Sequence, residues 1–143
     1  MTKWLACVVA LLCSVLAVGG GGMGVRQQEQ EPVRQVLVSF EDLDYPYGPR
    51  AGMEQGLVVV DLRLDDKGVP VSASALTGPK LLIPYATANA KQWRFEPNAQ
   101  RRAIVVYDFS IGGGACHDPS RSLFLLRRPN FAEIKSCDVV ISR

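Results

Sequence analysis

Histidine is almost absent from this chain of 143 residues, which has only His117 beside 16 Lys and Arg and 14 Asp and Glu. Zinc sites built on histidine and Ser-His-Asp triads both depend on well-placed imidazoles, so one histidine argues against either. The formal net charge is only +2, whereas a surface for nucleic acid normally has a strong excess of Lys and Arg. We therefore expect neither a histidine-based site nor a nucleic-acid partner.

Glycine and proline are too few, at 13 and 9 residues, for a fibrous or wholly disordered chain. Hydrophobic residues make up 48% of the sequence and charged residues 21%, and no internal repeat is visible. At this length, such a composition predicts one folded domain.

The N-terminus lacks an apolar run long enough for a clean membrane span. After Lys3, residues 4–18 are uncharged and mostly apolar, as in the hydrophobic region of a secretory signal peptide. A spanning helix needs about 20 apolar residues, and an extension to Val25 adds mainly glycine, which costs about 1 kcal/mol per helical position. We predict a cleaved signal peptide over residues 1–19 and a periplasmic or secreted protein. An uncleaved inner-membrane anchor is the alternative, and only a retained anchor would bring the protein to a membrane.

Two of the four cysteines fall within the predicted signal peptide, which leaves Cys116 and Cys137. An even pair in an exported protein predicts a disulfide, which would stabilise the fold by about 3 kcal/mol for a loop of this length. A metal site or a nucleophilic pair that uses Cys116, His117 and Asp118 is the weaker alternative. An oxidising compartment favours the bridge, and nothing nearby in the sequence suggests an oxyanion hole. We expect no metal ion and no cofactor.

The clearest structural pattern is a β-hairpin from Gly56 to Gly78. Apolar residues alternate with others at positions 58, 60, 62 and 64, and again at 69, 71, 73 and 75, which predicts two strands with one buried face. Between them, Asp65-Asp66-Lys67-Gly68 is a turn in which Gly68 can adopt a positive φ. Pro70 has no amide donor, so we expect it at a sheet edge or a bulge.

Other elements flank the hairpin. Residues 20–33 predict a flexible linker, residues 36–40 a short strand, and residues 42–52 a turn with one helical turn after it. Residues 81–93 predict a helix, with Pro84 in its first turn and one apolar face formed by Leu82, Ala86, Ala90 and Trp93. A strand over residues 102–111 follows, and residues 123–126 and 137–141 are strand-like.

Several of these features occur in an order typical of one family. Tyr45-Pro46 precedes Gly56, the hairpin turn has the form Asp65-x-x-Gly68, Gly78-Pro79 precedes the helix, and the helix ends in Trp93-Arg94-Phe95-Glu96-Pro97. Over residues 45–111 the chain resembles the C-terminal domain of the energy transducer TonB and its relatives.

The resemblance implies an α+β fold with two layers, in which an antiparallel sheet of three to four strands packs against one main helix. This domain would cover residues 34–111, and residues 112–143 would form a C-terminal extension stapled by the predicted disulfide. Most motif residues are expected to be structural, with Trp93 and Phe95 as core anchors rather than contact residues. The structural set is Gly56, Gly68, Gly78, Leu82, Ala86, Trp93, Phe95 and Pro97.

The family usually binds an extended segment of an outer-membrane receptor by adding it to a sheet edge, so that main-chain hydrogen bonds supply the affinity. By this analogy Arg102–Ile111 is the expected edge, and the partner is a protein or peptide of the cell envelope. The expected contact residues are Tyr45, Pro46, Val105, Tyr107 and Phe109, although packing is the favoured role for Tyr45-Pro46. No residue is expected to perform covalent chemistry, so the resemblance implies a binding module and not an enzyme.

The sequence departs from that family in three ways. The only histidine lies outside the N-terminal segment, a long Pro-rich spacer is missing, and the linker of residues 20–33 would average about 20 Å, too short to span a periplasm. A membrane-anchored energy transducer component for TonB-dependent outer-membrane transport is therefore the alternative function. A small hydrolase or redox enzyme is a third. We also hypothesise that Leu123–Leu126 or Val139–Ile141 covers the edge that a receptor peptide would use.

Overall fold

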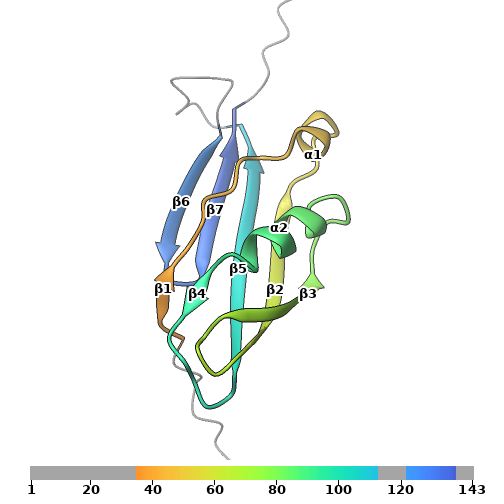
Figure 1. Cartoon of the computed structure of the whole chain (residues 1–143). Helices are drawn as coiled ribbons and strands as arrows, with labels where there is room; N and C mark the ends of the chain where they lie inside the picture. The colour runs from red at the N-terminus through yellow and green to blue at the C-terminus, as the bar shows by residue number, and fades with distance from the viewer. Residues whose placement is uncertain (1–34, 113–121, 138–143) are drawn as a thin grey trace, which may run out of the picture.

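The computed structural model describes residues 35–112 and 122–137. Its main sheet has five strands in the spatial order β3-β2-β5-β7-β6, and a small ribbon pairs β1 with β4 (Figure 1). The elements in chain order are β1 (Leu37–Ser39), α1 (Tyr47–Ala51), β2 (Gly56–Leu64), β3 (Pro70–Thr77), α2 (Ile83–Ala90), β4 (Arg94–Phe95), β5 (Arg102–Ile111), β6 (Leu123–Arg128) and β7 (Phe131–Ser136).

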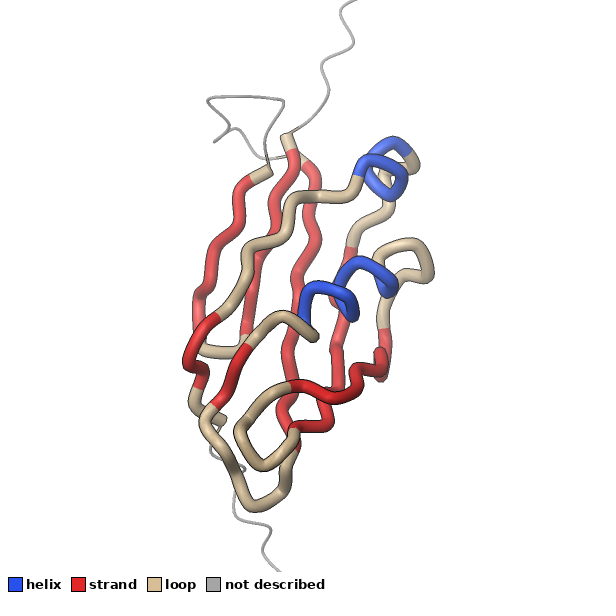
Figure 2. Tube along the Cα trace, in the orientation of Figure 1, coloured by secondary structure: helices blue, strands red, loops and turns tan. Residues whose placement is uncertain are grey.

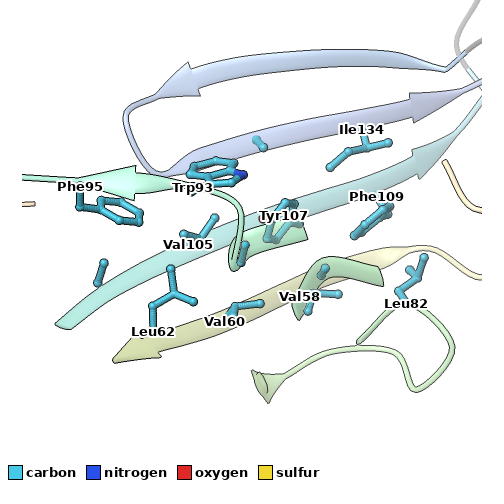
Figure 3. Packing of buried hydrophobic residues seen from close by; sticks show 14 of the residues in the cluster. Val58, Val60, Leu62, Leu82, Trp93, Phe95, Val105, Tyr107, Phe109 and Ile134 are labelled. Atoms are coloured by element: carbon cyan, nitrogen blue, oxygen red, sulfur yellow. The ribbon is translucent and has the colours of Figure 1, made fainter. Parts of the chain in front are cut away.

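The fold is α+β with two layers. Helix α2 and the β1–β4 ribbon lie over one face of the sheet, as the tube in Figure 2 shows. The inward side chains of β2 and β5 are buried there and pack with those of α2 and β7 (Figure 3). The largest fully buried side chains include Trp93, Tyr107, Phe109, Leu62, Leu82 and Ile134. The period-2 patterns of both central strands therefore face one core, as the sequence predicted.

The β2–β3 hairpin closes through a turn that Asp65 holds. Its carboxylate accepts hydrogen bonds from the backbone N–H groups of Lys67 and Val69, at 2.9 and 2.8 Å. The Val69 bond is the main cause of a lowered pKa for Asp65. Gly68 has a φ of 79°, and a Cβ there would lie 1.8 Å from the carbonyl oxygen of Phe95. Only glycine fits this close approach to the backbone of Phe95. Pro70 begins an edge strand beside a register shift, as expected.

Helix α2 is shorter than the predicted helix of residues 81–93. It ends at Ala90, after which hydrogen bonds from Gln92 N–H to the Asn89 carbonyl and from Trp93 N–H to the Ala90 carbonyl tighten the chain. Trp93 therefore follows the helix but still faces the core. The four residues expected on the buried face, Leu82, Ala86, Ala90 and Trp93, are all fully buried.

The expectation of an antiparallel sheet of three to four strands is wrong, because the C-terminal extension adds two strands to the sheet. β7 pairs with β5 in parallel, with Val106 opposite Phe131 and Ile111 opposite Ser136. β6 lies outside β7 and pairs with it in the antiparallel sense. Although β6 precedes β7 in the chain, β7 lies between β5 and β6 in the sheet. The sheet is therefore mixed, and the inward side chains of β6 and β7 share one core with residues 35–111.

Some predictions fall on residues outside the described part of the chain. They are the signal peptide over residues 1–19, the linker over residues 20–33, Cys116, and the strand-like run after Cys137. Because only Cys137 of the predicted disulfide is described, the pairing stays a prediction. Within residues 35–112 and 122–137, no helix is long and apolar enough to cross a membrane.

Candidate functional site

The strand expected to be a free edge is the centre of the sheet. β5 pairs with β2 on one side and with β7 on the other, so its expected role as an edge is wrong. The side chains of Val105, Tyr107 and Phe109 are at most 1% exposed and face the core (Figure 3). Burial also raises the pKa of Tyr107 far above that of a free tyrosine. These three residues hold the fold together and leave no surface for a partner.

Tyr45 and Pro46 are also buried, in agreement with their favoured packing role. The Tyr45 ring meets Phe109 edge-on, with centroids 5.5 Å apart, and its hydroxyl donates a hydrogen bond to the carbonyl oxygen of Glu54. Burial, with a smaller contribution from Glu54, raises the pKa of Tyr45 to about 12. The Tyr-Pro motif therefore fixes the chain entering α1 onto the core.

The other motif residues have structural roles, with one exposed member. Trp93 and Phe95 are buried with stacked rings, as expected of core anchors. Gly56, Gly68 and Gly78 all have positive φ, and a Cβ at Gly78 would lie 2.9 Å from a methyl group of Val58. Pro97 is exposed after β4.

A buried polar cluster that the sequence did not reveal centres on Asn89. Its side-chain oxygen accepts hydrogen bonds from Trp93 Nε1 at 2.9 Å and from the Tyr107 hydroxyl at 2.8 Å. Its amide nitrogen donates to the carbonyl oxygens of Glu41 and Asp42, both at 3.1 Å. Asn89 thus ties α2, β5 and the chain after β1 together. No sequence signal marks it, because one Asn in a short helix looks like a surface residue.

The two real edges of the sheet are β3 and β6. Two features of β3 discourage pairing with another strand: it begins with Pro70, and its register with β2 shifts twice. β6 begins with four consecutive apolar residues, Leu123 to Leu126, and its single register shift lies at the far end, before Arg128. Among the described residues, no strand pairs with β6 on the side away from β7. Figure 1 shows β6 at one margin of the sheet. β6 is therefore the edge more open to strand addition.

The segment from Gln35 to Tyr45 runs along β6 in the opposite direction, on the core face. At one end, Gln35 Oε1 accepts hydrogen bonds from Asn130 Nδ2 in the β6–β7 turn and from the Ile104 N–H. At the other end, the Tyr45 N–H donates to Ser122 Oγ at 2.8 Å. These contacts fix the segment on the core face, so it does not pair with the outer side of β6, which no described strand covers.

Between these anchors, aromatic stacking joins the segment to β6. The Phe40 ring stacks on that of Phe124 with centroids 5.7 Å apart, and it also meets Trp93 at 5.8 Å. Phe40 is nevertheless 42% exposed, and its neighbour Val38 is 64% exposed. An apolar surface that begins in the core therefore continues to solvent beside β6.

A shallow groove of about 430 Å³ lies between β1 and the end of β6. Its walls are Leu37, Val38 and Phe40 on one side and residues 126–129 on the other. Apolar groups from both sides line it, and the guanidinium groups of Arg127 and Arg128 stand at one end of β6. The end of the edge strand β6 forms one wall of the groove, so a strand added along this end of β6 would run beside the groove.

The positive charge at this end of β6 is partly compensated. Arg127 forms an ion pair with Glu133 at 3.2 Å, and Lys135 approaches the same carboxylate at 3.4 Å. Burial alone would raise the pKa of Glu133, but these two cations outweigh it and lower the pKa. Arg128 is exposed, and no carboxylate of the described residues lies within ion-pair distance of it. The groove therefore has a basic end, where none of the described carboxylates compensates the charge of Arg128.

Within the described ranges, no group of three or more His, Cys, Asp or Glu side chains could hold a metal ion. Cys116, His117 and Asp118 lie outside those ranges. What the described arrangement offers chemically is a main-chain edge, an apolar groove and a cationic end. In general, an extended peptide that adds to a sheet edge uses main-chain hydrogen bonds for affinity and side-chain pockets for selectivity.

No family model, no curated protein and no solved structure matches this chain. The resemblance to the TonB C-terminal domain therefore remains a prediction from the motif residues.

Proposed function

We propose that this protein is a periplasmic binding module without enzymatic activity, which recognises an extended segment of another cell-envelope protein by β-strand addition at β6. The proposal moves the expected mode of binding from β5 to the new edge of the sheet. It rests above all on one observation, the apolar edge strand β6 whose outer side no described strand covers.

Two further features support strand addition at this edge. Unpaired N–H and C=O groups on an edge strand can accept a strand from another chain, and natural proteins usually protect such edges with proline, bulges or charge. β3 has such protection, whereas residues 123–126 do not. Added side chains would also meet the exposed surfaces of Val38 and Phe40, so the new strand would bury apolar area as well as form hydrogen bonds.

A peptide with blocked amides tests the proposal. The best binder to the folded chain is selected from a library of random ten-residue peptides. It is then resynthesised as two variants, one with N-methyl groups on its odd-numbered residues and one with N-methyl groups on its even-numbered residues. Alternate residues of an added strand direct their N–H groups toward β6. Methylation of that set of residues should therefore weaken binding by at least tenfold. Methylation of the other set of residues should change the affinity little. Equal affinity for both methylated peptides, or failure of every peptide to bind, would contradict strand addition.

A further inference from the structure

We infer that the segment bound at β6 carries an apolar side chain for the groove and, beyond it toward the β6–β7 turn, a carboxylate for Arg128. This inference rests on the proposed function and adds the chemistry of the partner. It follows from the groove and the charge at its end, which the main-chain hydrogen bonds of strand addition do not specify.

The apolar half of the inference comes from side-chain alternation. In an added strand every second side chain would point to the core face of the sheet. On that face Phe124 and Leu126 are half-buried and pack against the core, while Val38 and Phe40 extend the same apolar surface to solvent. Leu, Ile, Val or an aromatic residue at these positions of the partner would continue the core, whereas a polar side chain would lose its hydration there.

The acidic half comes from charge. Arg128 lies beside the groove, is exposed, and has no carboxylate of the described residues within ion-pair distance. Arg127 is already paired with Glu133, so it adds less. A guanidinium binds a carboxylate through two parallel hydrogen bonds, and this geometry favours Asp, Glu or a chain terminus of the partner over a neutral residue. Complementary charge here would fix which register of the segment binds.

The test is a charge exchange between peptide and protein. Three peptides derived from the selected binder differ only in the residue nearest Arg128, which is Glu, Gln or Lys. They are measured against the wild type, against Arg128→Glu, and against Arg63→Glu, which makes the same charge change at an exposed site on β2. The Glu peptide should bind the wild type about two- to fivefold more tightly than the Gln peptide at low salt, as expected of an exposed ion pair.

The order of affinity should reverse in Arg128→Glu, where the Lys peptide should bind best, and it should stay unchanged in Arg63→Glu. The difference between the peptides should shrink in 1 M salt, because the Debye length falls to about 3 Å. Replacement of the groove-facing apolar residue of the peptide by Ala should weaken binding by about tenfold in every variant.

The outcomes separate the two proposals. One outcome is that the Glu, Gln and Lys peptides have the same affinity for the wild type and for Arg128→Glu, while N-methylation still weakens binding on only one set of alternate residues. In that case strand addition stands and the acidic specificity is overturned. If N-methylation has no register dependence, strand addition itself fails. Two other occupants would also overturn the inference. If Glu29 or Glu31 of this chain occupies the site, the double variant Glu29→Gln/Glu31→Gln should bind the peptide more tightly than the wild type. If a second copy of the chain occupies it, the free protein should be a dimer that the peptide dissociates.

Discussion

The Phe40 ring stacks on that of Phe124, with centroids 5.7 Å apart and ring planes at 17°. Phe40 belongs to the chain that follows β1, and Phe124 belongs to the edge strand β6, 84 positions later in the numbering. This contact connects the apolar groove to the core, because Phe40 also meets the buried Trp93.

Truncation of Phe40 should therefore affect stability and peptide binding together. We expect Phe40→Ala to lower the free energy of unfolding by about 1–2 kcal/mol, because two aromatic contacts of a half-exposed ring are lost. Urea denaturation measures this change, and titration with the selected peptide should show weaker binding. Tyr47→Ala is the control, because Tyr47 is 85% exposed. An equal loss of peptide binding in both variants would contradict the assignment of the groove.

The Asn89 cluster should be a major source of stability. Asn89→Ala would leave the Trp93 Nε1–H and the Tyr107 hydroxyl without their buried acceptor and two carbonyl groups without a donor, so we expect a loss of about 3 kcal/mol or more. Tyr107→Phe removes one hydroxyl while Trp93 keeps its bond to Asn89, so we expect a loss of about 1 kcal/mol. Chemical denaturation of both variants checks this order, and a reversed order would disprove the central role of Asn89.

Gly68→Ala should be far more damaging than the same change at Gly48. The alanine would adopt a φ of 79°, and its Cβ would have to displace the backbone of Phe95, so we expect a loss of about 3 kcal/mol or more. Gly48→Ala serves as the comparison, because the added carbon would meet no heavy atom within 4 Å outside its two chain neighbours and the backbone of α1. That change should be neutral or stabilise the fold by about 0.5 kcal/mol. Thermal melting of both variants should separate them clearly.

Stability at high pH should depend on Tyr45. Burial raises its pKa to about 12 in the folded state, whereas a free tyrosine has a pKa of 10.0. The folded state therefore holds this proton more tightly, and its contribution to stability is complete below pH 10 and falls as the pH rises toward 12. Tyr45→Phe cannot ionise, so its unfolding free energy should decline less over this range. Parallel decline of the two proteins between pH 10 and 12 would show that Tyr45 does not contribute.

Local patterns in the sequence were sufficient to predict the central elements. β3 forms as a strand, but its expected buried face is wrong, because no residue of this edge strand is fully buried and Val71 is 65% exposed. Alternation did define the buried faces of β2 and β5, four apolar residues defined the buried side of the helical segment, and Asp65 with Gly68 defined the hairpin turn. These features depend on residues close in the chain, where backbone geometry and side-chain periodicity determine burial.

The edges of the sheet were not predictable in the same way. β7 has alternation at Ala132, Ile134 and Ser136, but only Ile134 among these inward residues has a large apolar side chain, and the parallel pairing of β7 with β5 joins segments that are distant in the chain. The groove joins residues 37–40 to residues 126–129, which are distant in the chain. A site built from such separate parts follows from the topology, and local patterns do not contain it.

Amide hydrogen exchange of β6 tests the central claim most directly. In an edge strand, alternate N–H groups of residues 123–128 point away from β7 and should exchange fast in the free protein. Saturation with the selected peptide should slow these amides by at least tenfold, while the amides of β3, residues 70–77, remain unchanged. Protection of β3 instead of β6, or no new protection in either strand while the peptide is bound, would contradict strand addition at β6.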